Sequence, residues 1–244
     1  MEKGLVLYMG PEYPKHIERY LSITWIPIIS IEPINGCSKD FIARLEPCDC
    51  IAFTSPRGPR ILAEDARKHG IIEYIKLKVR RKRVAVVGSR TWESFEKHFD
   101  KTPDIIPRKY QGCDLALELI KQECRCVLLA RSLQGLKDIN YRLRESGVTY
   151  VETWLYREEV KKQSMARIKK LLEGNDVRYV ILSSPIISRS FCKHFSSYLK
   201  DVRLVAIGLS SLNAAKEICK NKNIIVPRQY SLEGVAELMN TEGI

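Results

Sequence analysis

The sequence predicts an α/β protein with two similar halves, each a doubly wound parallel sheet. Short apolar runs rich in Val and Ile alternate with helical patterns along the chain. The stretch 83–110, RVAVVGSRTWESFEKHFDKTPDIIPRKY, returns in diverged form at 203–230 as RLVAIGLSSLNAAKEICKNKNIIVPRQY. A chain of 244 residues is long enough for two domains of ordinary size. Because parallel strands need a helical crossover between them, ten strands alternating with helices give two five-stranded sheets.

The duplication defines a repeated unit of strand, turn, helix and strand. In both copies a β-branched run ends at a glycine, a hydroxyl residue follows, a helical pattern begins, and a short Ile/Val run leads to Pro-Arg-x-Tyr. Three positions match at one constant offset: Gly88 with Gly208, Pro107 with Pro227, and Tyr110 with Tyr230. An earlier pair, CIAFTSPR at 50–57 and YVILSSPI at 179–186, extends the duplication backwards.

The elements follow from hydrophobic periodicity and from Gly and Pro breaks. Strands are expected at 4–10, 48–55, 83–88, 105–106, 124–130, 178–183, 203–208 and 224–226. Helices are expected at 15–21, 40–45, 59–69, 71–78, 92–99, 115–122, 136–145, 164–172, 188–199, 212–220 and 232–239. Two further extended runs, 25–32 and 148–160, are too long for one sheet. They suggest segments that leave one sheet, pair with each other and enter the second domain.

Composition favours a cytosolic protein with anionic partners. Lys and Arg exceed Asp and Glu by a net charge of +12, which favours nucleic acid, a membrane surface or a polyacidic small molecule. No apolar run approaches the ~18 residues of a membrane span. The densest basic run, KLKVRRKR at 76–83, is better explained as a solvated helix end that enters a strand than as a nucleic-acid arm, because no aromatic residues interleave with it.

The eight cysteines do not have metal-site spacing. Two C-x-C pairs, Cys48/Cys50 and Cys124/Cys126, lie on strand patterns, where the alternation of side chains would send both members to one face. We expect small hydrophobes in a reduced interior, with disulfides left open for a chain from a hyperthermophile.

Four turns at strand ends place small or hydroxyl residues where a carboxylate or phosphate could bind: 54–57 (TSPR), 88–91 (GSRT), 183–185 (SSP) and 208–211 (GLSS). Each precedes a helix N-terminus, where free N–H groups can bind a carboxylate or phosphate. Taken singly, each turn is better explained as a helix N-cap than as a ligand contact, because Ser and Thr are preferred caps regardless of function. Two matched pairs, one per domain, favour a shared site between the domains.

Cofactor and covalent chemistry find no support in the sequence. It contains no phosphate-binding G-x-x-x-x-G-K-[ST], dinucleotide-binding G-x-G-x-x-G or G-x-S-x-G motif, and its four histidines lie singly on helical patterns, where we expect surface positions. We therefore expect a binder of an acidic molecule that catalyses without cofactor, metal or covalent nucleophile.

These residues resemble the uroporphyrinogen-III synthase family over almost the whole chain. The resemblance is carried, in the family's order, by IAFTSPRG, VAVVGSRT, VLLAR with GVTYVETWLY, YVILSSP, VAIGLSS and VPRQYSLEGVAEL. It implies two flavodoxin-like domains joined by a two-stranded antiparallel β linker. One domain would combine 1–31 with 161–244, the other would span 38–151, and 32–37 with 152–160 would be the linker. This arrangement replaces a plain tandem split near residue 121.

The implied reaction closes linear hydroxymethylbilane to uroporphyrinogen III, with loss of water and inversion of ring D through a spiro intermediate. Tyr156 matches the family tyrosine thought to assist departure of the hydroxyl. Ser55, Thr91, Ser184, Ser210 and Ser211 match turns that hold substrate carboxylates, largely through backbone N–H groups, and Arg57 is an added cation. The resemblance implies a cytoplasmic monomer without cofactor that binds neither nucleic acid nor membrane.

The chain departs from the family pattern at three places, Leu209, Ile186-Ile187 and Ser132. Two other readings remain open: a non-catalytic two-domain small-molecule binding or sensor protein, and a nucleic-acid-binding module that uses residues 76–83.

Overall fold

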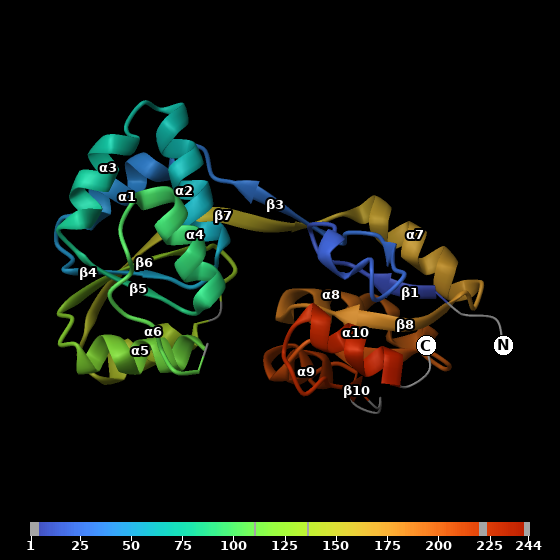
Figure 1. Ribbon diagram of the computed structural model, residues 1–244. Helices are drawn as coiled ribbons and strands as arrows, with labels where there is room; N and C mark the ends of the chain where they lie inside the picture. The colour runs from blue at the N-terminus through green and yellow to red at the C-terminus, as the bar shows by residue number, and fades with distance from the viewer. Residues whose placement is uncertain (1–4, 110, 136, 220–223, 242–244) are drawn as a thin grey trace. The chain divides into compact units, whose positions relative to one another are not determined.

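The chain forms two compact units, each with its own five-stranded sheet, in a computed structural model that describes residues 5–109, 111–135, 137–219 and 224–241 (Figure 1). Unit 1 comprises residues 1–30 and 159–244, and unit 2 comprises residues 31–158. Tyr110 of the duplication and the expected element ends at 4, 136 and 220 lie outside the described residues.

The sheet of unit 1 is parallel, in the order β10-β9-β8-β1-β2. Its strands are β1 (Leu5–Tyr8), β2 (Thr24–Trp25), β8 (Val177–Leu182), β9 (Arg203–Ala206) and β10 (Ile224–Ile225). Its helices are η1 (Lys15–Ile17), α7 (Lys162–Glu173), α8 (Pro185–Phe195), η2 (Ser196–Tyr198), α9 (Leu209–Lys216) and α10 (Leu232–Thr241). Leu7 and Met9 pack with α7, α8 and α9 on one face, whereas Val6 and Tyr8 pack with η1 and α10 on the other. Strand alternation thus produces the expected doubly wound arrangement.

The sheet of unit 2 has the order β3-β7-β6-β4-β5. Its strands are β3 (Ile29–Pro33), β4 (Cys50–Phe53), β5 (Arg83–Val86), β6 (Cys126–Ser132) and β7 (Thr149–Val160). Its helices are α1 (Cys37–Leu45), α2 (Arg57–Lys68), α3 (Ile72–Arg80), α4 (Ser89–Phe99), α5 (Gly112–Lys121) and α6 (Asp138–Glu145). One core cluster joins α1 to α4 with Ile51 and Phe53 of β4, and the opposite one joins α5 and α6 with Cys50 and Ala52. Both faces of the sheet are therefore covered by helices.

The first overlong extended run is two strands, because its backbone is interrupted at Pro27. β2 is an edge strand of the first sheet and β3 an edge strand of the second. Proline lacks the N–H that a continuous ladder would use, so the pairing changes there. The second run is one strand, β7, and the backbone N–H of Ile34 donates to Leu155 at 3.0 Å while that of Lys161 donates to Ile28 at 2.8 Å. The chain therefore passes from one sheet to the other through extended segments.

Helices begin closer to the strand ends than periodicity predicted. α4 begins at Ser89 rather than 92, α8 at Pro185 rather than 188, and α2 at Arg57 rather than 59. Proline tolerates the first helical turn because the N–H it lacks would have no intrahelical partner there. The expected strand at 105–106 is reduced to a single bridge between Ile105 and Ala85. The early starts place the turn residues in or beside the first helical turn.

Six of the eight cysteines form disulfides, which corrects the expectation of a reduced interior. The pairs are Cys48–Cys126, Cys50–Cys124 and Cys192–Cys219, with Cα separations of 4.4, 6.0 and 5.7 Å. The expectation that each C-x-C pair shares one face was also wrong. Cys48 and Cys126 belong to one core cluster and Cys50 and Cys124 to the opposite one, since only one cysteine of each pair lies within a strand.

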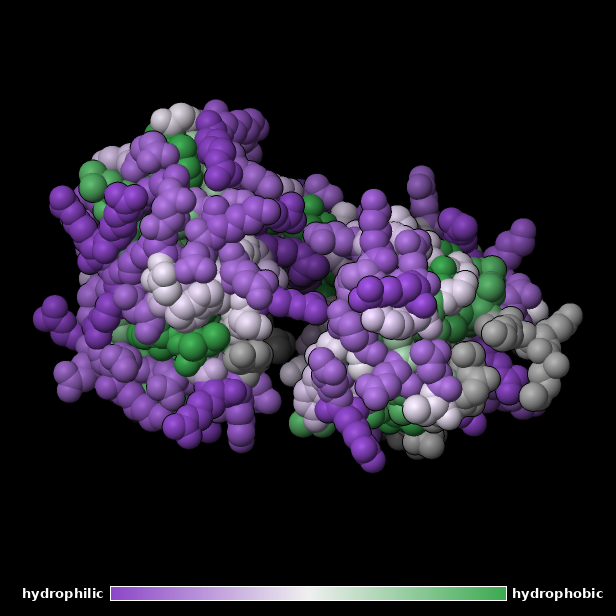
Figure 2. Space-filling view, in the orientation of Figure 1, coloured by the Kyte–Doolittle hydropathy of each residue, from purple (hydrophilic) through white to green (hydrophobic). Residues whose placement is uncertain are grey.

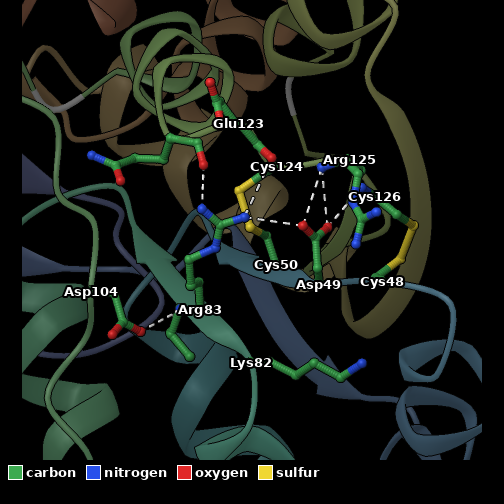
Figure 3. Close-up of a disulfide and its surroundings, with 12 residues drawn as sticks. Cys48, Asp49, Cys50, Lys82, Arg83, Asp104, Glu123, Cys124, Arg125 and Cys126 are labelled. Carbon is green, nitrogen blue, oxygen red and sulfur yellow. Dashed lines mark hydrogen bonds and ion pairs between the residues drawn. A yellow bond between two sulfur atoms is a disulfide. The ribbon is translucent and has the colours of Figure 1, made fainter.

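The Asp49 side chain lies between the Cys48–Cys126 and Cys50–Cys124 disulfides (Figure 3). The Asp49 carboxylate accepts hydrogen bonds from the backbone N–H of Cys126 at 2.8 Å and of Arg125 at 3.1 Å, and it pairs with Arg83 at 3.0 Å. Burial alone would raise the pKa of Asp49, but the backbone hydrogen bonds and Arg83 hold it below its usual range. The amino ends of β4 and β6 are thereby joined by hydrogen bonds as well as by two disulfides, and the Asp49–Arg83 ion pair adds the amino end of β5.

The basic run is a helix end that enters a strand, as expected, since it spans the end of α3 and the start of β5. Its cations contact acidic groups of the same unit: Lys76 pairs with Asp100 at 2.7 Å and Lys78 with Glu46 at 3.5 Å. Hydrophilic residues cover most of the face drawn in Figure 2. No helix among the described residues is both long and apolar enough to cross a membrane. Two of the histidines expected at the surface, His69 and His98, are partly buried.

Candidate active site

The carboxyl ends of β4 and β6 form the topological switch point of unit 2. From β4 the chain continues to β5 on one side, and it later returns through β6 on the other side of β4. Ligands of open α/β sheets bind at such points, because the loops there diverge and leave a crevice. Ser55 follows β4 and Ser132 ends β6, so both belong to this edge of the sheet.

The Ser55 turn is closed by its own backbone and by helix α2. The Ser55 hydroxyl accepts from the Arg57 N–H at 3.2 Å, and its carbonyl accepts from the Gly58 N–H at 3.1 Å. A Cβ at Gly58 would lie 3.1 Å from the Phe53 ring and 3.5 Å from the Ala130 carbonyl. The glycine of TSPRG therefore lets α2 approach the sheet closely and holds Arg57 at the start of the helix.

Helix α4 begins beside the same turn. The Ser94 hydroxyl donates to the Pro56 carbonyl at 2.7 Å, and Thr91 lies one helical turn earlier. Thr91 itself is only 1% exposed. A ligand at this helix N-terminus would therefore meet backbone N–H groups before it met the Thr91 hydroxyl.

A register shift in β7 sets the position of Tyr156. Arg131 of β6 pairs with Trp154, but the next residue, Ser132, pairs with Tyr156, so Leu155 is an extra residue in the ladder. Both Leu155 and Tyr156 consequently join the core cluster on the α2 face of the sheet. Bulges of this kind re-aim a side chain, and they recur next to active sites.

Tyr156 lies with Ser55 and Arg57, two other residues expected at the site. Its side chain is 2% exposed and forms hydrogen bonds with both of them. Burial raises the pKa of the Tyr156 phenol, while the hydrogen bond with Ser55 and the charge of Arg57 oppose the rise. The phenol is therefore protonated at neutral pH and can donate a proton.

Two residues that sequence reasoning missed complete this group. Glu158 lies two residues beyond Tyr156 on β7, and burial raises its pKa while Arg57 opposes the rise. Gln134 holds the Glu158 backbone through both ends of its amide, since its Oε1 accepts from the Glu158 N–H at 2.9 Å and its Nε2 donates to the carbonyl at 3.2 Å. The only sequence signal was the even spacing of Glu158 from Tyr156, which on a strand indicates a shared face.

Unit 1 has its own switch point, between β1 and β8, and Ser184 follows β8 there. The Ser184 hydroxyl accepts from the Ile187 N–H at 3.4 Å, which makes Ser184 the N-cap of α8. Its side chain is thus already engaged, and a ligand would compete for the same N–H groups.

Ser210 and Ser211 lie in the first turn of α9, after the neighbouring strand β9. Ser210 is exposed, whereas Ser211 is only 2% exposed. Gly208, which precedes them, lies against Tyr230, because a Cβ added at Gly208 would be only 3.2 Å from the Tyr230 ring. The matched Gly and Tyr of the second copy are therefore in contact. Within unit 2 the structure brings Ser55, Arg57 and Tyr156 together, and within unit 1 it places the Ser184 and Ser210–Ser211 turns on neighbouring strands.

Chemically, these residues offer proton transfer and anion binding. Among the residues that the structure describes, no group of three His, Cys, Asp or Glu side chains is placed to hold a metal ion. The Tyr156 phenol carries an exchangeable proton, and burial lets the Glu158 carboxyl group hold one to higher pH than usual because it raises the pKa of that group. Arg57 carries a positive charge, and several helices begin at these strand ends. Fold and site define an α/β protein of two sheets whose turns and helix N-termini lie at the carboxyl ends of parallel strands.

Comparison with known proteins identifies the family. The model of the uroporphyrinogen-III synthase HemD family matches residues 18–237. The chain therefore belongs to the uroporphyrinogen-III synthase family, whose members are cyclising lyase-type enzymes of tetrapyrrole biosynthesis.

Individual relatives agree with this assignment. A protein of Methanocaldococcus jannaschii, named provisionally as a uroporphyrinogen-III synthase, is 26% identical over 215 residues, which cover 84% of this chain and 83% of the relative. The crystal structure of uroporphyrinogen-III synthetase from Helicobacter pylori superposes with a TM-score of 0.69 at 13% identity, covering 98% of this chain and all of that one. A mutant uroporphyrinogen III synthase from Thermus thermophilus gives 0.67 at 13% identity, covering 98% of each chain. These two similarities concern the fold.

Proposed function

We propose that this chain cyclises hydroxymethylbilane to uroporphyrinogen III, with Tyr156 as the proton donor to the departing hydroxyl. The observation that carries the proposal is the contact of the buried, protonated Tyr156 with Ser55 and Arg57 at the switch point of unit 2. Family membership supplies the reaction, and this contact supplies a group able to start it.

The first step needs an acid, because hydroxide is a poor leaving group. The C–O bond of the terminal hydroxymethyl group breaks, and its oxygen takes the Tyr156 proton and leaves as water. The lone pair of the adjacent pyrrole nitrogen supplies the electrons that the carbon loses. Ring closure with inversion of ring D, through the spiro intermediate, later releases a proton from a pyrrole carbon, so no net acid is consumed. General acid catalysis of this kind contributes roughly 10²–10⁴-fold.

Binding would rely on charge and on helix N-termini. The substrate carries an acetate and a propionate on each pyrrole, and the chain carries +12. Arg57 and the N–H groups that start α2 and α4 would bind carboxylates in unit 2, and those that start α8 and α9 would do so in unit 1. Ser55, Thr91, Ser184, Ser210 and Ser211 mark these turns, and in this proposal most of their contribution comes from the backbone.

We also propose the finer architecture that the family implies. Read from the β2 edge, the sheet of unit 1 has the order β2-β1-β8-β9-β10. Numbered along the chain within unit 1, this is the order 2-1-3-4-5, which is flavodoxin-like. The bonds from Ile34 to Leu155 and from Lys161 to Ile28 support an antiparallel linker, because residue numbers rise along β3 as they fall along β7. In this proposal the domains are 1–31 with 161–244 and 38–151, linked by 32–37 and 152–160, whereas the two compact units divide the chain at residues 30/31 and 158/159.

The test is isomer analysis of the uroporphyrin formed from freshly generated hydroxymethylbilane, run beside the uncatalysed reaction and heat-denatured protein. The unaided bilane closes to isomer I, so a product dominated by isomer III is the expected result. Isomer I at the uncatalysed rate would refute the synthase and leave a binding protein on the same fold.

A further inference from the structure

The carboxyl group of Glu158 lies near Tyr156, the candidate proton donor. The proposed reaction gives Glu158 no role. Glu158 lies on the last part of β7, two residues beyond Tyr156, and it is half-buried between the exposed Arg157 and Glu159. Side chains two apart on a strand share a face. Both residues accordingly interact with the same cation, Arg57 at the start of α2.

Two hydrogen bonds with Gln134 fix the backbone of Glu158 and do not involve its carboxyl group. Gln134, in the loop after β6, binds the N–H and the carbonyl of Glu158 and not its side chain. The Gln134 backbone N–H in turn donates to the Ser132 hydroxyl at 3.2 Å. Ser132 is where the chain departs from the glycine common in the family, so this chain holds Glu158 through a hydroxyl that glycine lacks.

We propose that Glu158 is a positioning residue that acts through Tyr156: its carboxylic acid returns the proton that Tyr156 gives to the leaving hydroxyl. This proposal rests on the proposed function above. After the first step Tyr156 would be a phenolate beside a protonated Glu158. Transfer of the Glu158 proton restores the phenol and leaves a carboxylate paired with Arg57. The proton released from the pyrrole carbon on ring closure then reprotonates Glu158, so protons balance over one turnover.

The electrostatics agree with this direction of transfer. The groups that face Glu158 are Arg57 from α2 and Tyr156 from its own strand, with the neutral amide of Gln134 from the loop after β6. Burial extends the protonated form of Glu158 to higher pH, and Arg57 is in place to stabilise the carboxylate once the proton has left. The donor form is lost as pH rises through the pKa of Glu158. Turnover should fall over the same interval.

The experiment compares the pH profile of kcat for isomer III formation in the wild type, Glu158→Gln and Glu158→Asp. Glutamine keeps the size and hydrogen bonding but carries no acid proton, so we expect kcat to fall about ten- to hundredfold and the decline at high pH to vanish. Aspartate keeps the acid, so it should restore a declining limb at a changed pH. Glu159→Gln is the matched control, because Glu159 is exposed and its side chain alternates to the opposite side of β7.

Each result decides one question. A Glu158→Gln profile that parallels the wild type, with isomer III still formed, would overturn the role of Glu158 while the proposed function stands. If Glu158→Gln does not fold, the Glu158→Asp profile decides: a decline at the wild-type pH overturns the proposal. If the wild type gives only isomer I at the uncatalysed rate, the proposed function fails and the role of Glu158 fails with it.

Discussion

Ser132 of β6 lies opposite Tyr156 of β7, one residue beyond the partner that a regular ladder would give it. The shift makes Leu155 the extra residue and brings the Tyr156 ring into the core cluster beside the Ser55 turn. Without it, alternation would send the side chain at 156 to the side opposite Leu155. The position of the candidate proton donor therefore depends on a local irregularity of the sheet.

Tyr156→Phe should slow formation of isomer III by at least about 10²-fold, because the ring remains and the donated proton is lost. The product should shift towards isomer I as the uncatalysed closure competes. Loss of the hydrogen bonds with Ser55 and Arg57 should cost about 1 kcal/mol of unfolding free energy. Rates and isomer ratios would be measured by chromatography of the oxidised porphyrins.

Tyr141→Phe serves as the control for that experiment, since Tyr141 is 65% exposed and lies on α6 of the same unit. It should retain the wild-type rate. A Tyr156→Phe variant that performs as well as Tyr141→Phe would show that the phenol donates no proton.

Ser184→Ala should lower the unfolding free energy by about 1 kcal/mol, because the hydroxyl caps α8 by accepting from the Ile187 N–H. Ser184→Gly should cost only a few tenths. Isomer III formation should fall less than about tenfold in either variant if backbone N–H groups supply most of the binding, since one side-chain hydrogen bond contributes about 1 kcal/mol. Urea unfolding and steady-state rates would measure the two effects separately, and a larger loss of rate in both variants would contradict backbone binding.

Alkylation under denaturing conditions should modify two cysteines before reduction and all eight after it. The two are Cys37 and Cys113, the free thiols of the structure. Mass spectrometry would count the modifications, and peptide mapping would identify the pairs. Eight modified thiols in the unreduced protein would show that the interior is reduced after all.

Reduction should also lower the melting temperature. Each native disulfide typically contributes about 2–4 kcal/mol, so loss of the pairs that join β4 to β6 should destabilise unit 2 substantially. Calorimetry with and without a reductant would measure the change. Cys113→Ser, which removes a free thiol, should leave the effect of the reductant as it is in the wild type.

Asp65 should make the free energy of unfolding vary with pH in the acid range. Burial alone would raise its pKa, but hydrogen bonds from the Ser38 hydroxyl and from the N–H groups of Ser38 and Gly36 lower it. A lowered pKa in the folded state means that the stabilisation is complete above the unfolded value of about 3.9 and is lost as pH falls through the folded value. Asp65→Asn should cost about 1–3 kcal/mol at neutral pH and reduce the slope below pH 4.

Glu64→Gln is the matched control, because Glu64 is exposed and pairs with Arg60 on the same helix at 3.5 Å. Such surface pairs contribute about 0–1 kcal/mol, so its acid profile should resemble that of the wild type. Denaturant melts from pH 2 to pH 7 would compare the variants. Equal slopes for Asp65→Asn and the wild type would contradict the assignment to Asp65.

The sequence was informative where a pattern is local or repeated. Alternating elements gave the fold class, the duplication gave the paired turns, and the order of six segments gave the family, which the comparison confirmed. Element ends were less accurate, since Pro185 and the residues after Gly88 look like turns in sequence but start helices. Capping geometry, and not hydrophobic periodicity, determines those ends.

Features that depend on which strands are neighbours could not be predicted. The Cys48–Cys126 and Cys50–Cys124 pairs result from β4 lying beside β6, more than 70 residues away along the chain. Glu158 became a candidate only because Gln134 and Arg57 approach it from two different segments. The register shift at Leu155 has no signal in the sequence that we could identify, since no glycine or proline marks it.

The discontinuity of unit 1 has a consequence for synthesis on the ribosome. Strands β1 and β2 emerge first, but their neighbour β8 begins at Val177, after every element of unit 2. Unit 2 can therefore complete its sheet while the early strands still await a partner, and translation imposes an order of assembly that refolding from denaturant does not. The apolar β1 segment must remain without its partner β8 through that delay, so pausing or truncation before residue 177 should favour its aggregation.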